Sequence, residues 1–259
     1  MAKQNYKYIY GPVSSWRLGR SLGVDPISYK RKICTFDCLY CQLGEAEAFS
    51  DRRMVFVDVA EIIDELDLLP PIQIDYITFS GAGEPTLAKN LGQMIKSVKE
   101  TRKTKTAVIT NSSLIDKVDV QDDLLQADCV VAKLDAASSS VFDRINRPTE
   151  TIKFNTVIHA LRKFRDIYKG KLAIQIMFIE ENKKFAHEIS QIVKEINPDE
   201  VQINTPLRVC KVKPLSESEL FHIKSYFKDF NAISVYEASK KHVNSISNKD
   251  TLARRGKII

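Results

Sequence analysis

The chain has 259 residues, of which 44% are hydrophobic and 28% charged, a balance typical of a folded globular protein and not of a disordered one. The formal net charge of +6 at pH 7 is modest and by itself indicates no particular partner. The longest apolar run, residues 172–179, is interrupted by Gln175 and is too short to span a membrane. With no apolar signal-peptide core at the start and an odd count of 5 cysteines, we expect a cytoplasmic protein without a disulfide framework.

The first 26 residues are expected to form an N-terminal lead-in and not a regular element. They are rich in glycine and turn residues and show no helical period. They include Trp16, the only tryptophan of the chain. Arg17 and Arg20 are either surface arginines in a turn or groups that contact a carboxylate or a phosphate.

Beyond this lead-in, strands and helices are predicted to alternate. Apolar, β-rich runs predict strands at residues 27–33, 74–79, 106–109, 129–134, 172–179 and 201–204, with an edge strand at 232–236. Apolar residues at helical spacing predict helices at 58–69, 86–99, 113–125, 151–168, 183–196 and 216–227. Ser216 and Glu219 are placed to form a capping box. The alternation predicts an α/β domain of parallel strands and crossover helices, and it leaves open whether the sheet is flat or closed into a barrel.

The most informative stretch contains Cys34, Cys38 and Cys41, at a C-x3-C-x2-C spacing. Thiolates this close together select zinc or an iron–sulfur cluster. A structural zinc site needs four ligands, and the next cysteine and histidine along the chain are the distant Cys129 and His159. A four-iron cluster on three cysteines keeps one iron open for a ligand. A zinc site completed by a distant residue and a ferredoxin-like carrier are the weaker alternatives.

This triplet, with Tyr40 before its last cysteine, resembles the signature of the radical S-adenosylmethionine (SAM) superfamily. The resemblance implies a [4Fe-4S] cluster on the three cysteines whose open iron is chelated by the amino and carboxyl groups of SAM. It also implies that one electron, from a flavodoxin- or ferredoxin-type reductant, cleaves SAM to methionine and a 5'-deoxyadenosyl radical. The implied fold is an incomplete (β/α)6 barrel. We therefore expect one radical SAM domain over residues 1–259, with a lead-in at 1–26, a partial barrel at 27–227 and a C-terminal segment at 228–259.

Ligands of parallel α/β folds bind at the carboxyl ends of the strands, and the candidate SAM contacts fall there. They are Tyr40, Gly81, Ala82, Gly83, Glu84, Asn111, Ser112, Asp135, Gln175 and Asn204. Glycines in the turn at 81–84 let the backbone approach a ligand closely. The resemblance implies that this turn holds the SAM amino group, with Ala82 where many relatives have glycine. It also implies that the backbone of Tyr40 faces the adenine.

The other candidates each have a structural alternative. Asn111 and Ser112 either reach the SAM ribose or carboxylate or simply cap a helix. Asp135 either accepts ribose hydroxyls or orients the substrate. Gln175 and Asn204 need hydrogen-bond partners if they are buried, and SAM, substrate or a neighbouring strand could serve.

The two remaining cysteines and the basic runs are weaker signals. Cys129 heads a buried strand and is expected in the core. Cys210 is either a structurally neutral cysteine or a thiol at the mouth of the active site. Basic residues at 30–32, 99–105, 162–171 and 254–257 are either solvated surface or a contact for nucleic acid.

The chain also resembles a narrower group, the wyosine-synthase-related Fe–S oxidoreductases, at residues 11–15, 17–25, 38–44, 144–148, 202–206 and 254–257. Wyosine synthases carry a second cluster on upstream cysteines, and no cysteine precedes Cys34 here, which indicates a single-cluster member. Three functions stay open. The first is radical modification of RNA such as tRNA, or of a protein. The second is radical chemistry on a small metabolite or a glycyl-radical activase. The third is a non-catalytic, metal-stabilised binding module.

Overall fold

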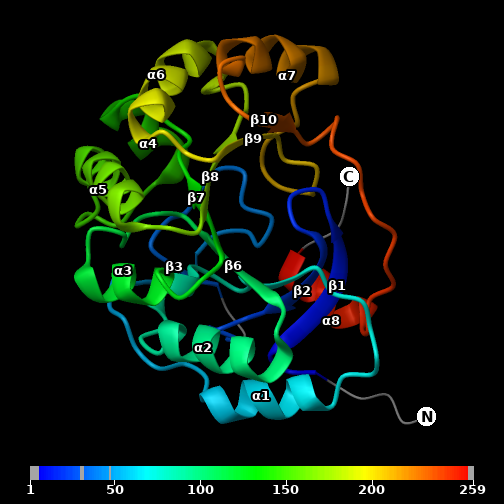
Figure 1. Ribbon diagram of the computed structural model, residues 1–259. Helices are drawn as coiled ribbons and strands as arrows, with labels where there is room; N and C mark the ends of the chain where they lie inside the picture. The colour runs from blue at the N-terminus through cyan, green and yellow to red at the C-terminus, as the bar shows by residue number, and fades with distance from the viewer. Residues whose placement is uncertain (1–5, 30–31, 47, 256–259) are drawn as a thin grey trace.

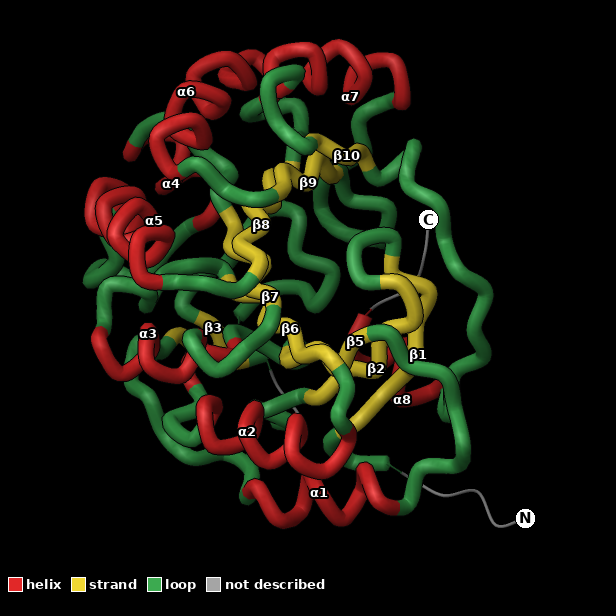
Figure 2. The backbone as a smooth tube through the Cα atoms, in the orientation of Figure 1, coloured by secondary structure: helices red, strands yellow, loops and turns green. Residues whose placement is uncertain are grey.

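The apolar runs predicted as strands from residue 74 onward lie side by side in one curled sheet, with helices covering its outer face (Figures 1 and 2). The computed structural model describes residues 6–29, 32–46 and 48–255. The sheet has the strand order β1-β2-β5-β6-β7-β8-β9-β10. These strands are β1 (Ile9–Ser15), β2 (Gly19–Val24), β5 (Tyr76–Phe79), β6 (Lys105–Thr110), β7 (Cys129–Lys133), β8 (Lys171–Met177), β9 (Glu200–Asn204) and β10 (Ala232–Ser234).

Every neighbouring pair in this sheet is parallel except β1 with β2, which form an antiparallel hairpin. A second, two-stranded sheet pairs β3 (Ile33–Cys34) with β4 (Ala48–Phe49). The central strands are apolar on both faces because helices cover one face and the barrel interior the other. The predicted incomplete α/β barrel is confirmed.

The helices α1 to α7 bury apolar residues against the rest of the protein. In α6, for example, Ile189, Val193 and Ile196 are buried. The helices are α1 (Val59–Asp67), α2 (Leu91–Arg102), α3 (Val118–Leu124), α4 (Ser139–Asn146), α5 (Phe154–Ile167), α6 (Ala186–Ile196), α7 (Glu217–Lys224) and α8 (Asn248–Arg255), with 3-10 turns η1 (Pro85–Leu87), η2 (Lys183–Phe185) and η3 (Ser225–Phe227). Among the helices that the structure describes, none is long and apolar enough to cross a bilayer.

The prediction of the first strand at residues 27–33 is wrong. Residues 30–31 lie outside the described part of the chain, and of the remainder only Ile33 is in a strand, β3, which is not part of the main sheet. The first parallel strand is β2, inside the stretch expected to be an irregular lead-in. Its glycines hide the strand signal. At Gly23 the ring of Tyr10 occupies the place of a side chain, since a Cβ there would lie 2.1 Å from that ring.

Other elements differ less. The helices expected from residues 86 and 113 begin later, at Leu91 and Val118, and the edge strand at 232–236 is confirmed as β10. Two helices were not predicted, α4 and α8. α8 has no buried residue among those described and therefore no apolar period in its sequence. It packs on β1, where the backbone N–H of Gly11 donates to Thr251 Oγ1 at 3.1 Å.

The barrel is open on one side, between its edge strands β1 and β10. The C-terminal segment leaves β10 and runs along this open side to α8, which lies beside β1 (Figure 1, orange to red). Strand β1 and helix α8, which are far apart in the sequence, therefore pack together where the sheet fails to close.

The predicted capping box of α7 is present, since Ser216 Oγ accepts from the Glu219 N–H at 3.3 Å and the Glu219 carboxylate accepts from the Ser216 N–H at 2.8 Å. We expect Ser216→Ala to lower the free energy of unfolding by about 1 kcal/mol, because a backbone N–H loses its partner. Urea denaturation measures this. The control is Ser218→Ala in the same exposed turn, which should change the value by less than about 0.5 kcal/mol; equal effects of the two would contradict the cap assignment.

Candidate active site

The loop that carries Cys34, Cys38 and Cys41 (residues 34–41, the cysteine loop) begins in β3 and is held by the end of α4. The backbone N–H of Asp37 donates to the carbonyl of Asn146 at 3.0 Å, and that of Leu39 donates to Ile145 at 2.9 Å. All 5 cysteines of the chain are free. The loop is thus fixed by backbone contacts that leave its thiols available as ligands.

Two amide side chains reach the sulfur atoms of this loop. Asn111 Nδ2 lies 3.5 Å from Cys34 Sγ, and Asn146 Nδ2 lies 3.5 Å from Cys38 Sγ. Donors at this position stabilise a negatively charged sulfur ligand. Burial, with the Glu84 carboxylate nearby, raises the pKa of the Cys34 thiol to about 12, so a thiolate there requires a strongly bound cation.

The donor set fits the iron–sulfur cluster that the family resemblance implies. No three His, Cys, Asp or Glu side chains in the described residues are placed to share one metal ion. In a four-iron cluster, by contrast, each of the three cysteines binds a different iron.

Lys32 also stabilises the loop, because its Nζ donates to Asp37 at 3.2 Å and to the carbonyl of Gly44 at 3.0 Å.

The turn at residues 81–84 pairs directly with the start of the cysteine loop. The N–H of Ile33 donates to the carbonyl of Ala82 at 3.1 Å, and the N–H of Glu84 donates to the carbonyl of Ile33 at 3.1 Å. Gly83 is required for this approach, since a Cβ there would lie 1.7 Å from the Ile33 carbonyl oxygen. Strand β3, where the cysteine loop begins, and the turn after β5 are therefore joined by backbone hydrogen bonds.

The carboxylate of Glu84 is fully used inside the protein. It accepts from Thr86 N–H at 3.1 Å, Thr86 Oγ1 at 2.7 Å, Thr110 Oγ1 at 2.7 Å and Asn111 N–H at 2.7 Å. Burial raises its pKa, and these hydrogen bonds oppose the shift. Glu84 fastens the turn to the end of β6, so the turn presents its backbone, and not this side chain, to a ligand.

Tyr40 is held by a buried network. Its hydroxyl donates to Asp135 Oδ2, and Asn146 Nδ2 donates to both groups, at 3.0 Å to Tyr40 and at 2.9 Å to Asp135. The second oxygen of Asp135 accepts from the Met177 N–H at 2.7 Å. Lys133 Nζ lies 4.2 Å from the centre of the Tyr40 ring. Both carboxylate oxygens of Asp135 are thus engaged with protein donors and orient Tyr40.

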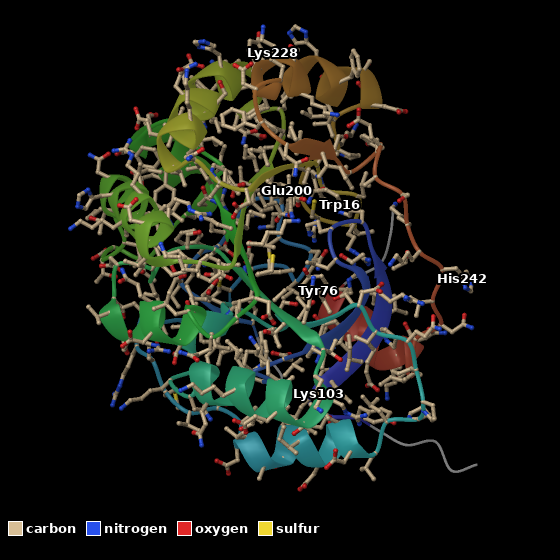
Figure 3. All side chains as sticks on the ribbon, viewed as in Figure 1. Trp16, Tyr76, Lys103, Glu200, Lys228 and His242 are labelled. Carbon is tan, nitrogen blue, oxygen red and sulfur yellow. The ribbon has the colours of Figure 1, made fainter. Side chains whose placement is uncertain are left out.

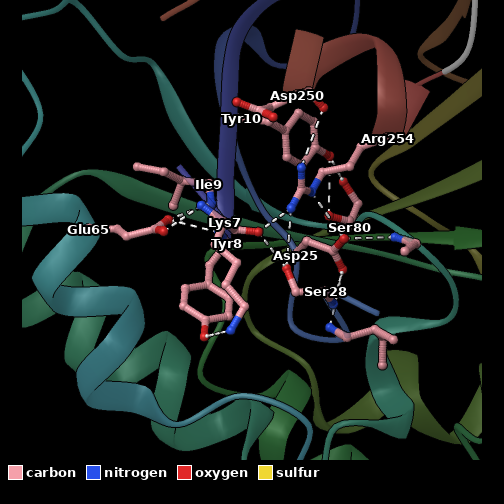
Figure 4. Close-up of polar contacts among 12 residues, drawn as sticks. Lys7, Tyr8, Ile9, Tyr10, Asp25, Ser28, Glu65, Ser80, Asp250 and Arg254 are labelled. Carbon is pink, nitrogen blue, oxygen red and sulfur yellow. Dashed lines mark hydrogen bonds and ion pairs between the residues drawn. The ribbon is translucent and has the colours of Figure 1, made fainter. Parts of the chain in front are cut away.

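Asp25 ties the turn to the C-terminal helix (Figure 4). It accepts from the Ala82 N–H at 3.0 Å, from the Ser28 N–H at 3.0 Å and from Arg254 Nε at 3.2 Å. It also fills the space beside Gly81, where a Cβ would lie 2.1 Å from the carboxyl carbon. Burial raises the pKa of Asp25, while these hydrogen bonds and Arg254 act against the shift.

A cavity of about 720 Å³ opens beside this assembly. Its walls come from β1, the ends of β5 and β9, the loop after β9 and α8, and Tyr40, Gly81 and Asn204 are among its lining residues. A volume of this size is within the range of small-molecule sites. The cavity therefore connects the cysteine loop and the 81–84 turn with the open side of the barrel.

The remaining predicted residues are placed differently. Ser112 is fully buried and donates to the Lys133 carbonyl at 3.0 Å, outside the cavity lining. Gln175 is buried in β8, and its Nε2 has no hydrogen-bond partner among the described residues. Cys129 is in the core, as predicted. Cys210 donates to the Val212 carbonyl at 3.2 Å and does not line the cavity.

Several residues that shape the site are not predicted by local sequence patterns. Asn146, Lys133 and Asp25 were missed because each acts through a partner far along the chain. Asn146 lies in residues 144–148, which resemble the related oxidoreductases, but its local sequence does not predict its contacts with Tyr40 and Asp135. Asp25 lies in residues 17–25, which carry the same resemblance, but its local sequence does not predict its contact with Arg254.

The chain is similar to known proteins in sequence and in fold. The profile of the Radical SAM superfamily matches residues 31–196. A UPF0026 protein of Synechocystis is 40% identical over 201 residues, which are 77% of this chain and 76% of that protein. Among solved structures, SuiB of Streptococcus suis bound to S-adenosylmethionine superposes with a TM-score of 0.63 at 17% identity, over 80% of this chain and 49% of SuiB. Archaeal TYW1 superposes with a TM-score of 0.58 at 13% identity, over 81% of this chain and 72% of that one.

We expect Gly83→Ala to prevent proper assembly of the cluster, because the new Cβ would push the Ile33 carbonyl away and shift the cysteine loop. The iron and sulfide bound after anaerobic reconstitution should fall to a small fraction of the wild-type content. The matched control is Ala82→Gly, which removes one methyl group next door and should keep the iron. Full iron in Gly83→Ala would show that the loop does not depend on this backbone contact.

Proposed function

Because the chain belongs to the radical SAM superfamily, we propose that it holds a [4Fe-4S] cluster on Cys34, Cys38 and Cys41 and binds S-adenosyl-L-methionine beside it. The bound group supplies one-electron cleavage of SAM and a 5'-deoxyadenosyl radical that abstracts hydrogen from a substrate. One observation carries the proposal: the three cysteines lie on a loop that is fastened to the 81–84 turn and borders a cavity.

The residues of this chain bind and orient. The backbone of the turn at 81–84 offers carbonyl and amide groups to the amino acid part of SAM, since Glu84 is occupied elsewhere. Tyr40, fixed by Asp135 and Asn146, borders the cavity and is placed to position the adenosyl part. Asn204 lines the same cavity. Asn111 and Asn146 stabilise the charge on the cysteine sulfurs.

We propose that a flavodoxin- or ferredoxin-type protein supplies the electron and that the enzyme works in the cytoplasm. The free state of all 5 cysteines supports a reducing compartment. For the substrate, RNA such as tRNA is the first candidate, supported by the runs of basic residues at 99–105, 162–171 and 254–257. A phosphorylated or other small metabolite is the second, favoured by the size of the cavity.

We expect Cys34→Ala, Cys38→Ala and Cys41→Ala each to reduce reductive cleavage of SAM to background, because loss of one ligand removes or disrupts the cluster. The measurement is 5'-deoxyadenosine formed under anaerobic conditions with a strong reductant. Cys210→Ala is the control and should retain both iron and cleavage. Wild-type protein that binds iron but never cleaves SAM would instead support a metal-stabilised binding module.

If RNA is the substrate, tRNA binding should weaken with salt. If the protein displaces a few counterions from RNA phosphates when it binds, its affinity for tRNA should fall roughly tenfold or more between 50 and 200 mM salt. Filter binding or fluorescence anisotropy with the reconstituted protein measures it. Absence of tRNA binding at low salt would reject RNA and leave the small metabolite as the substrate class.

A further inference from the structure

The cavity beside the cysteine loop has a one-sided charge. Its described lining includes the cationic side chains of Arg17, Arg208, Lys240, Arg254 and Arg255, and no aspartate or glutamate. An accidental surface hollow in a protein with 33 acidic residues would be expected to include carboxylates. A cavity lined by one sign of charge attracts ligands of the other sign.

Two of these cations have other roles or positions. Arg254 is committed to Asp25, with its Nε 3.2 Å from the carboxylate. Lys240 is exposed to solvent. The other three, Arg17, Arg208 and Arg255, are partly buried and come from three separate parts of the chain, namely the turn between β1 and β2, the loop after β9, and α8.

Arg17 is oriented within the cavity wall. Its guanidinium carbon lies 4.7 Å from the centre of the Trp16 ring, and its Nε is buried without a hydrogen-bond partner among the described residues. The carboxylate whose charge acts on Arg17 is that of Glu200, and Figure 3 labels both Glu200 and Trp16. Glu200 is already engaged by Lys171 Nζ at 2.7 Å and by Gln202 Nε2 at 2.7 Å. Arg17 therefore keeps hydrogen-bonding capacity for a ligand.

The three arginines are close enough to repel one another. Burial, and next the charge of Arg255, lowers the pKa of both Arg17 and Arg208 to about 10. Burial also lowers the pKa of Arg255. Gathering like charges in a partly desolvated wall opposes folding unless an anion balances them.

We propose that Arg17, Arg208 and Arg255 form a subsite for a phosphate group of the substrate. A phosphate carries up to two negative charges and several acceptor oxygens, which match guanidinium groups in bidentate geometry. The carboxylate of SAM carries one charge, and SAM also brings a positive sulfonium. The hydroxyls of Ser14, Ser245 and Thr251 in the same lining add neutral donors. The subsite rests on the proposed function in one respect, that this cavity receives the substrate.

The test measures anion binding to cluster-loaded protein, by calorimetry and by the fluorescence of Trp16, the only tryptophan of the chain. Inorganic pyrophosphate is the probe, with sodium chloride at equal ionic strength as the blank. We expect saturable binding in wild type that is at least tenfold weaker in Arg17→Gln. If Arg17→Gln misfolds, Arg208→Gln serves as the second variant, and thermal unfolding identifies such a failure.

The matched control is Arg20→Gln in the same hairpin. Arg20 pairs with Asp75 at 3.0 Å and does not line the cavity, and Asp75 keeps Lys241 as a second cation at 3.1 Å. Arg20→Gln should therefore bind pyrophosphate as wild type does. Unchanged binding in both Arg17→Gln and Arg208→Gln, or an equal loss in Arg20→Gln, would overturn the subsite.

Competition identifies the source of the phosphate. Ribose 5-phosphate that displaces pyrophosphate indicates a small phosphate ester, and a short single-stranded RNA that displaces it where ribose 5-phosphate does not indicates nucleic acid; both support the subsite. Malonate binding as tightly as pyrophosphate, or pyrophosphate displacing SAM, would overturn it, since the arginines would then serve a carboxylate. Pyrophosphate binding is read without turnover, so a wild type that binds it but fails to cleave SAM would refute the proposed function alone.

Discussion

The backbone pairing between Ile33 and the 81–84 turn is the contact on which the rest of the site depends. It joins β3, which carries the first cysteine, to the end of β5 in the main sheet. The close approach is possible only because Gly83 has no side chain. Once the contact forms, the thiols, the turn and the ends of β6 and β7 lie at one edge of the barrel, where parallel strands present their ligands. The cysteine spacing alone would leave the loop without an orientation.

Around this contact, buried carboxylates organise the site without facing the cavity. Glu84 holds the turn to β6, Asp135 orients Tyr40, and Asp25 joins the turn to α8. Each accepts several hydrogen bonds, which offset the penalty of burying its charge. Because these acids are used inside the protein, the described lining of the cavity contains cations, hydroxyls and amides but no carboxylate. The electrostatic character of the cavity thus follows from how the fold uses its acidic residues.

The fold class and the cysteine loop could be predicted from local pattern. The alternation of strand and helix patterns predicts β5 to β10, and the spacing of the three cysteines predicts the candidate metal ligands. The β1–β2 hairpin could not be recognised, because Gly23 lies beneath Tyr10 and a glycine carries no apolar signal. Asn146 and Tyr40 are hydrogen-bonded although 106 positions separate them in the sequence, and Arg254 and Asp25 although 229 do. Contacts at such separations cannot be predicted from local sequence patterns. Ser112 has the right position after β6, but its backbone turns with φ of 70° and buries the side chain away from the cavity.

The part of the chain that the superfamily profile matches and the segments outside it contribute different residues to the site. The superfamily profile covers residues 31–196, which hold the cysteine loop, the 81–84 turn and the network around Tyr40. Arg17, Arg208 and Arg255 all lie outside that range, in the hairpin, the loop after β9 and α8. These segments border the open side of the barrel between β1 and β10, where a sheet that fails to close leaves room for a ligand. Radical generation therefore maps to the part that the superfamily shares, whereas the charges proposed to select the substrate come from the two flanking segments, which Arg254 and Asp25 fasten together over the site.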